Sequence, residues 1–418
     1  MFVLLIPIAI AAPAPLSVEE AVARAMAQAS DYQAAKDDED IAADEARSAG
    51  ARLLPAVGAE ATVIYNSPGA GTPGTQSFLS ENSVLWYRAT AGATGTLFGG
   101  LGAQLKADKA LVAAAHAGTE VARRDLAQAT IDAYYGVVLA NAQDSVAMEN
   151  RTAADELARV TALRFAAGEV PEVDVLRTRM LAAQRADERL QAQVAVDAAN
   201  SQLGVLIGGD SEWQVAALDG TRADLGAVEA LATANVGTSR PPAPSVAAAE
   251  AQVDAANASV GAARAEFLPQ VEYMVGYGFD TDTLGSALPQ HLGVTAGITL
   301  SVPIFDWGIG ARSVDAAKLS AHQAELARDQ AERGERADLA IAVSTARSAA
   351  RRSEGLAAVL SDAERNVAIS QARYSAGEAD LLEVTEAQQT LVDTRYASNT
   401  ALAEYQSALG HLRLLAGQ

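Results

Sequence analysis

The feature that most constrains the fold is an internal duplication. The order helix, hairpin, long helix, turn, helix occurs twice, and the segment Arg164–Glu169 (RFAAGE) matches the segment Arg373–Glu378 (RYSAGE). The pair Leu54-Pro55 precedes the first hairpin, as Leu268-Pro269 precedes the second. Alanine-rich helices can resemble one another by chance, but matching Pro and Gly residues in the same order do not follow from composition. The chain is therefore predicted to contain two copies of one unit.

Helix-breaking residues and hydrophobic periodicity predict where the elements of this unit begin and end. The predicted layout is a signal peptide at 1–14, a first repeat at 15–207 (helix 18–54, strands 57–66 and 84–97, helices 101–165 and 171–207), an equatorial connector at 208–245, and a second repeat at 246–418 (helix 246–267, strands 270–279 and 291–302, helices 310–375 and 380–415).

The N-terminal apolar run predicts export. Residues 2–12 are apolar apart from Pro7, but this run is too short for a helix that spans a bilayer, which takes about 20 residues. The small residues Ala12, Pro13 and Ala14 follow and suit cleavage of a signal peptide. A buried N-terminal segment is the alternative interpretation. No later stretch is apolar for long enough to predict a transmembrane helix.

The composition excludes several classes of function. The chain has 31 Lys and Arg residues against 52 Asp and Glu residues, a net charge of −21, whereas a nucleic-acid binder needs clustered cations. It contains no cysteine, so we expect no disulfide, thiolate metal site, Cys nucleophile or lipid anchor. Its glycine turns do not match a phosphate-binding fingerprint. We therefore predict that the protein is not an enzyme and binds no cofactor. The histidines lie on different predicted elements, without metal-ligand spacing: His116, His291, His322 and His411.

The predicted strands each have one apolar face. From Leu292 to Val302, and from Val271 to Phe279, apolar residues alternate with smaller or polar ones. This alternation over about ten residues is typical of strands that cross a bilayer with their apolar side toward lipid. The alternative is that both hairpins are small soluble sheets at the end of a helical rod.

The number of strands predicts a trimer. Four strands cannot close a barrel, and an open sheet edge is not tolerated in lipid. Three chains would supply about twelve strands, and a cyclic trimer is the simplest closure. The helices 101–165 and 310–375 would each extend roughly 100 Å, so they must lie along neighbours to bury their apolar stripes.

Several motifs resemble those of TolC-type outer-membrane efflux proteins. They are Leu16–Ala21 (LSVEEA), Ala51–Pro55 (ARLLP), Phe267–Gln270 (FLPQ), Val302–Gly308 (VPIFDWG) and the paired Arg-Phe/Tyr-x-Ala-Gly-Glu turns, in the right order over nearly the whole chain. The resemblance implies an α plus membrane-β fold: a homotrimer whose twelve-stranded β-barrel in outer-membrane lipid is continuous with a long periplasmic α-helical barrel. It also implies a passive exit duct of a tripartite efflux pump or a one-step secretion system, which engages a periplasmic adaptor (membrane fusion) protein and an inner-membrane efflux transporter.

The resemblance also assigns candidate site residues. The two turns between long and short helices would form the periplasmic tip that meets the adaptor, and carboxylates after each turn would form the pore constriction. Carboxylates repeated around a narrow pore attract cations. The alternatives are that each arginine only complements the macrodipole of its helix, and that the glutamates are only solvated. The tip residues are Arg164, Gly168, Arg373 and Gly377, and the constriction residues are Asp174, Glu383 and Glu386.

A second function class remains open at the level of sequence. The alanine-rich helices and the low aromatic content of 5% also fit a soluble periplasmic coiled-coil scaffold or adaptor protein.

Overall fold

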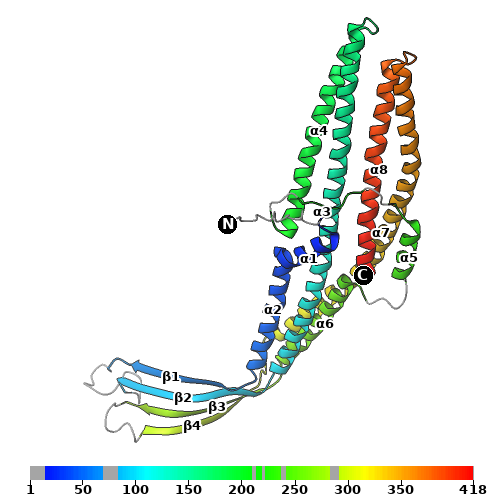
Figure 1. Ribbon diagram of the computed structural model, residues 1–418. Helices are drawn as coiled ribbons and strands as arrows, with labels where there is room; N and C mark the ends of the chain where they lie inside the picture. The colour runs from blue at the N-terminus through cyan, green and yellow to red at the C-terminus, as the bar shows by residue number, and fades with distance from the viewer. Residues whose placement is uncertain are drawn as a thin grey trace, which may run out of the picture. The chain divides into compact units, whose positions relative to one another are not determined.

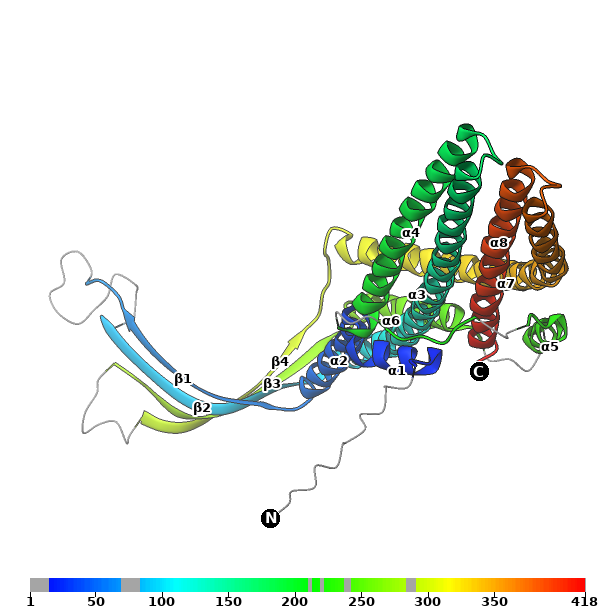
Figure 2. The ribbon, with the colours of Figure 1, turned by 45° about the horizontal axis from the view of Figure 1, so that its top comes forward.

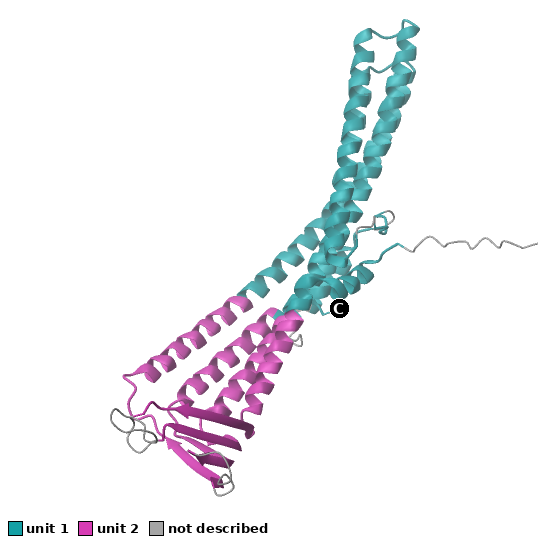
Figure 3. Ribbon diagram, turned by 90° about the vertical axis from the view of Figure 1, so that its left-hand side faces the viewer, with its two compact units in different colours: residues 1–34, 120–244, 333–418 teal, residues 35–119, 245–332 magenta. Residues whose placement is uncertain are grey.

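The computed structural model describes residues 15–68, 83–209, 213–218, 222–236, 242–282 and 291–417 (Figure 1). The predicted signal peptide, residues 1–14, lies outside the described residues. The chain divides into two compact units, one of residues 1–34, 120–244 and 333–418 and the other of residues 35–119 and 245–332 (Figure 3). Each unit takes segments from both halves of the chain. The compact units therefore differ from the two sequence repeats, because each long helix begins in one unit and ends in the other.

The second unit contains a four-stranded antiparallel sheet. Its strands are β1 (Ala56–Tyr65), β2 (Leu85–Phe98), β3 (Gln270–Thr281) and β4 (Leu292–Ser301), in the order β1-β2-β3-β4. The two hairpins therefore join through β2 and β3, and β1 and β4 form the edges of the sheet. Most of α2 (Ser30–Ala51) and α6 (Pro244–Ala265) also belong to this unit, as do the first parts of α3 (Leu101–Ala166) and α7 (Ile309–Ser375).

The first unit is helical. Its main elements are two helical hairpins that lie side by side, one of α3 and α4 (Glu172–Ile207) and one of α7 and α8 (Leu381–Leu415) (Figure 2). The short helix α1 (Val18–Gln28) packs against α3 and α4 around the fully buried Val137 and Leu203. The other short helix, α5 (Leu225–Val236), packs against α7 and α8 around Val228.

The single helix predicted over residues 18–54 is wrong, because the structure has two helices there. Ser17 caps α1 by accepting a hydrogen bond from the Glu20 backbone N–H at 3.1 Å. Ala29 then takes an extended conformation, with φ −64° and ψ 125°, before α2 begins at Ser30. The Ala29 side chain is buried in the same core cluster as α1. Alanine favours a helix, so tertiary packing overrides local propensity at this position.

The other elements differ from their predicted bounds by a few residues. The strand β3 extends to Thr281 rather than 279, and the predicted connector contains a full helix, α5. None of the helices in the described ranges combines the length and the apolarity that crossing a membrane would require.

Candidate functional site

The register of the sheet sorts its side chains onto two chemically different faces. Across the four strands, Ala59 aligns with Ala91, Tyr277 and Val294. The next row on either side that points to the same face is also apolar, and Val57, Val275 and Leu292 of these rows are exposed in the single chain. Side chains alternate along a strand, so the period-two pattern in the sequence becomes one continuous apolar face. The residues of this face are Val57, Ala59, Ala61, Val63, Tyr65, Leu85, Tyr87, Ala89, Ala91, Ala93, Val271, Tyr273, Val275, Tyr277, Phe279, Leu292, Val294, Ala296, Ile298 and Leu300.

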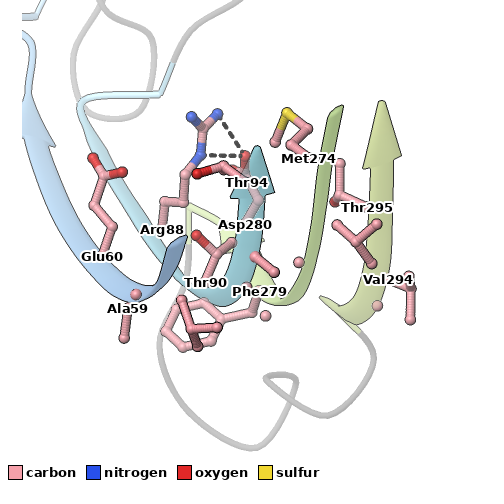
Figure 4. Close-up of a pocket in the computed structure, with 18 of the residues that line it drawn as sticks. Ala59, Glu60, Arg88, Thr90, Thr94, Met274, Phe279, Asp280, Val294 and Thr295 are labelled. Carbon is pink, nitrogen blue, oxygen red and sulfur yellow. Dashed lines mark hydrogen bonds and ion pairs between the residues drawn. The ribbon is translucent and has the colours of Figure 1, made fainter. Parts of the chain in front are cut away.

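The opposite face consists mainly of glycine and polar residues and lines a hollow of about 630 Å³. Figure 4 shows Glu60, Arg88 and Asp280 on this side of the sheet. The guanidinium of Arg88 donates two hydrogen bonds to one Asp280 oxygen, at 3.0 Å from Nε and 2.9 Å from Nη2. The indole of Trp86 donates to the other oxygen of the same carboxylate. Arg88 and Asp280 therefore join β2 to β3 by a charge-assisted pair.

Glycines let β2 and β3 approach closely on the polar face. A Cβ on Gly278 would lie 2.0 Å from the Ala89 carbonyl oxygen, and one on Gly92 would lie 2.4 Å from the Val275 carbonyl oxygen. By contrast, a Cβ on Gly293 in the edge strand β4 would meet nothing within 4 Å. The junction between the two hairpins thus requires glycine, whereas this edge position does not.

The two helical hairpins of the first unit, α3/α4 and α7/α8, reverse direction through turns of the same type. The Glu169 N–H donates to the Arg164 carbonyl and the Gly168 N–H donates to the Phe165 carbonyl, both at 2.9 Å. Glu378 and Gly377 make the equivalent bonds after α7. Gly168 and Gly377 have φ of 80° and 76°. This is a Schellman motif, in which glycine supplies the left-handed residue that ends the helix. The sequence-predicted glycines therefore stand where the geometry needs them.

Arg164 connects the two hairpin ends. Its Nη1 donates to the Tyr374 carbonyl at 2.9 Å, and its Nε lies 3.1 Å from Oε2 of Glu169. The guanidinium carbon lies 4.8 Å from the centre of the Tyr374 ring. The ring is buried, and its hydroxyl lies 3.4 Å from the buried Thr161 hydroxyl. The arginine of the first turn thus binds the backbone of the second.

Sequence reasoning missed Tyr374 and Thr161. The available signal was the difference between the two turn motifs, because the position of Phe165 in the first is occupied by tyrosine in the second. A hydroxyl gained at a matching position indicates a polar partner nearby.

Of the remaining predicted site residues, the structure brings together Arg373 and Glu383 but not Glu386 or Asp174. Arg373 binds within its own hairpin, with Nη1 2.6 Å from Oε1 of Glu383. Glu386 is exposed one turn further along α8. Asp174 is half-buried on α4 and lies 3.7 Å from Nη1 of Arg177. Of the three predicted constriction residues, Glu383 is thus paired to a cation across the turn and Asp174 lies near one on its own helix.

Further side-chain contacts connect the helices of the first unit. On α4 the buried Arg185 donates to Gln389 of α8. Between α3 and α8, the Ser407 hydroxyl donates to Asp132 at 2.6 Å, and His411 lies 3.0 Å from the same oxygen. Burial raises the pKa of Asp132, but the bonds from His411 and Ser407 outweigh it and leave that pKa lowered.

Charged pairs also fix two of the shorter helices. Arg347 of α7 binds both oxygens of Glu229 on α5, at 2.7 and 2.6 Å, and this hydrogen bonding lowers the pKa of Glu229. In the second unit, His116 of α3 lies 2.8 Å from Glu39 of α2, and that bond lowers the pKa of Glu39. No cluster of three or more His, Asp or Glu side chains that could hold a metal occurs within the described residues.

Comparison with known proteins gives consistent matches. The family model described as outer membrane efflux protein matches residues 21–209 and 237–418. Protein CyaE of Bordetella pertussis is 25% identical over 330 residues, which are 79% of this chain and 68% of that protein.

Three solved structures have a similar fold. The CmeC outer membrane channel of Campylobacter jejuni has a TM-score of 0.83 and 19% identity, covering 96% of this chain and 85% of that one. VceC of Vibrio cholerae has a TM-score of 0.79 and 18% identity, covering 96% of each chain. The open state of the MtrE outer membrane channel of Neisseria gonorrhoeae has a TM-score of 0.79 and 20% identity, covering 97% of this chain and 89% of that one.

Proposed function

Because the chain belongs to the outer membrane efflux protein family, we propose that it is the exit duct of a tripartite efflux pump or a one-step secretion system. The family places the protein in the outer membrane with a periplasmic part, and its members are channels rather than enzymes. The finer proposal is that three copies assemble into a passive conduit that engages a periplasmic adaptor and an inner-membrane transporter.

The two-faced sheet is the observation that carries the proposal. Its apolar face offers a surface for lipid, its polar face offers a surface for water, and its edge strands β1 and β4 each have one side to pair. An edge of a sheet in hydrocarbon must be paired. Pairing β1 of one chain with β4 of the next would satisfy every edge when three chains close a ring.

Cross-linking tests this assembly directly, because the chain contains no cysteine. Thr62 in β1 and Thr295 in β4 lie on the polar face. A scan of cysteine pairs around these two positions should give a covalent trimer after oxidation. Pairs between β2 and β4 serve as the matched control and should give none. If the protein is recovered from the soluble periplasm without detergent, the scaffold interpretation replaces the duct.

Conductance tests the duct itself. The purified protein should insert into planar bilayers and conduct, with a preference for cations that follows from the net charge of −21 per chain. Reversal potentials that indicate a preference for anions would contradict the acidic conduit.

We place the constriction at the carboxylates that follow the two turns. Because Glu383 pairs with Arg373, the exposed Glu386 should carry more of the pore's effective charge than Glu383. Glu386→Gln should therefore lower the ratio of cation to anion permeability. Asp362→Asn, at an exposed carboxylate of α7, is the matched control and should leave that ratio unchanged. An equal change in both variants would remove Glu386 from the constriction.

The adaptor contact is assigned to the two turns. Arg164, Gly168, Arg373 and Gly377 hold the shape of these hairpin ends, and an adaptor would recognise that shape. Gly168→Val should weaken adaptor binding in a pull-down, because a β-branched residue disfavours the φ of 80°. Gly118→Val on α3, where a Cβ meets nothing within 4 Å, controls for a general loss of helix stability.

A further inference from the structure

The turn between β4 and α7 holds two large aromatic rings out from the protein. Phe305 is 73% exposed and Trp307 is 81% exposed. Their ring centres lie 4.9 Å apart in an edge-on arrangement. The flanking Ile304 and Ile309 are also exposed. Four large apolar residues within six positions are unusual on a surface that faces water.

The backbone of this turn is built to hold that arrangement. Trp307 has φ of 57°, and it is the one non-glycine residue with positive φ in the described part of the chain. This conformation is costly for a side chain with a Cβ. The Asp306 carboxylate stabilises it by accepting hydrogen bonds from the N–H groups of Gly308 at 2.9 Å and Gly310 at 2.6 Å. Strain that is maintained in this way indicates a function for the residue that bears it.

The matching turn of the first repeat also follows exposed apolar residues, Leu97 and Phe98, but it lacks the strained tryptophan and its aspartate cap. Gly99 and Gly100 are the two residues between Phe98, which ends β2, and Leu101, which begins α3. Gly99 takes positive φ without a side chain, so that turn has no tryptophan and no aspartate cap. The exposed tryptophan is therefore not required simply to connect a strand to a helix in this fold.

We propose that the turn Ile304–Ile309 is a preformed lipid anchor, with the Trp307 ring at the head-group boundary on the periplasmic side of the outer membrane. The inference rests on the proposed duct, in which the apolar face of the sheet meets lipid. The turn continues that face directly, because Ile298 and Leu300 of β4 belong to it and are exposed. Tryptophan suits this boundary, since its ring favours the apolar side and its N–H the polar side.

Depth-dependent fluorescence quenching tests the anchor. The chain has three tryptophans, so Trp86→Phe with Trp213→Phe leaves Trp307 as the only indole. The purified protein is reconstituted into vesicles whose phospholipids carry bromine either near the head group or near the end of the acyl chain. Trp307 should lose clearly more of its emission with the shallow bromines than with the deep ones, as expected for a residue at the interface.

A reference variant separates this inference from the proposed duct. With all three native tryptophans replaced by phenylalanine, Tyr277→Trp places a single indole on the apolar face in the middle of β3. If this indole is quenched by deep bromines while Trp307 is quenched by neither lipid, the anchor is wrong and the membrane-facing sheet stands. If neither indole is quenched, the duct and the anchor both fail.

A second design guards against misfolding of the multiple variants. The otherwise unaltered protein is compared with Trp307→Leu, and the quenching by shallow bromines should fall with the loss of this one ring. Unchanged quenching would refute the anchor. A neighbouring copy of the chain is the competing occupant of this surface, and it would shield Trp307 from both brominated lipids.

Discussion

Replacing Arg164 with methionine should separate the two helical hairpins of one chain at their turn ends. Its guanidinium joins the hairpins through the 2.9 Å bond to the Tyr374 carbonyl and through its position 4.8 Å from the Tyr374 ring centre. Methionine keeps most of the length of the side chain and removes both interactions. Arg185 and Gln389 connect the hairpins further along, so the change should be confined to the ends.

The expected magnitude follows from these two contacts. A hydrogen bond from a charged donor contributes about 1.5–3 kcal/mol, and a partly exposed cation–π contact contributes about 0.5–1 kcal/mol. Arg164 is 20% exposed, which argues for the lower part of the combined range, about 2–3 kcal/mol. The Tyr374 carbonyl still accepts from the Gly377 N–H at 3.0 Å, so no buried acceptor is left unpaired. Each 1.4 kcal/mol is a factor of ten, and the separated state should become about 30- to 140-fold more populated.

Distance measurement between spin labels is a suitable assay. In the Arg164→Met variant, labels at Ala167→Cys and Ala376→Cys should report a broader, longer distance distribution than in the protein with Arg164. Arg373→Met is the matched control, because its guanidinium binds Glu383 within the same hairpin. If the two methionine variants widen the distribution equally, or if neither does, the reasoning from the Arg164 contacts is refuted.

Three further predictions concern the sheet, the anchor turn and an ion pair. Gly278→Ala should lower the melting temperature, because its Cβ would clash with the backbone of β2 at a cost of about 1–3 kcal/mol. Gly293→Ala, whose Cβ would meet no atom within 4 Å, should change the melting temperature little. Equal effects of the two variants would contradict the close approach of β2 and β3. Trp307→Gly should raise stability in detergent by about 1 kcal/mol through relief of the positive φ, while retention in vesicles decreases; thermal unfolding and flotation measure the two effects. The pKa of Glu39 is lowered by its bond to His116. The contribution of Glu39 to stability is therefore present above the ordinary carboxyl pKa of 4.5 and is lost as pH falls through the lowered folded-state pKa. Glu39→Gln should reduce the fall in melting temperature at acidic pH, and an unchanged fall would contradict a role for this bond in stability.

The fold class could be predicted because it depends on regularities that the sequence displays. Period-two alternation identified the strands, and a regular antiparallel register then had to place Val63, Tyr277 and Val294 on one face. The duplicated Pro and Gly residues gave the order of the elements, and Gly168 and Gly377 gave the helix ends. These inferences need only local geometry and a repeat.

The parts that could not be predicted depend on contacts between distant segments. The break at Ala29 follows from burial against α3 and α4, and no local residue marks it. Tyr374 becomes a partner of Arg164 only because the two hairpins lie side by side with their turns next to each other, and nothing in either turn motif indicates this. The strained Trp307 was visible as a residue, but its positive φ is set by the Asp306 cap.

The two units therefore satisfy their polar groups in different ways, and this difference has a consequence for assembly. In the helical unit, the two hairpins are joined within one chain by side chains such as Arg164 and Arg185. In the sheet, β2 and β3 are joined within the chain, but β1 and β4 each have one edge that no described strand of the same chain pairs. Lipid supplies no hydrogen bonds to such edges. If the duct is a closed ring, the helical unit can fold in a single chain, whereas the sheet reaches its stable state only when neighbouring chains pair their edge strands. Insertion of the sheet into the membrane and formation of the trimer would then be a single step.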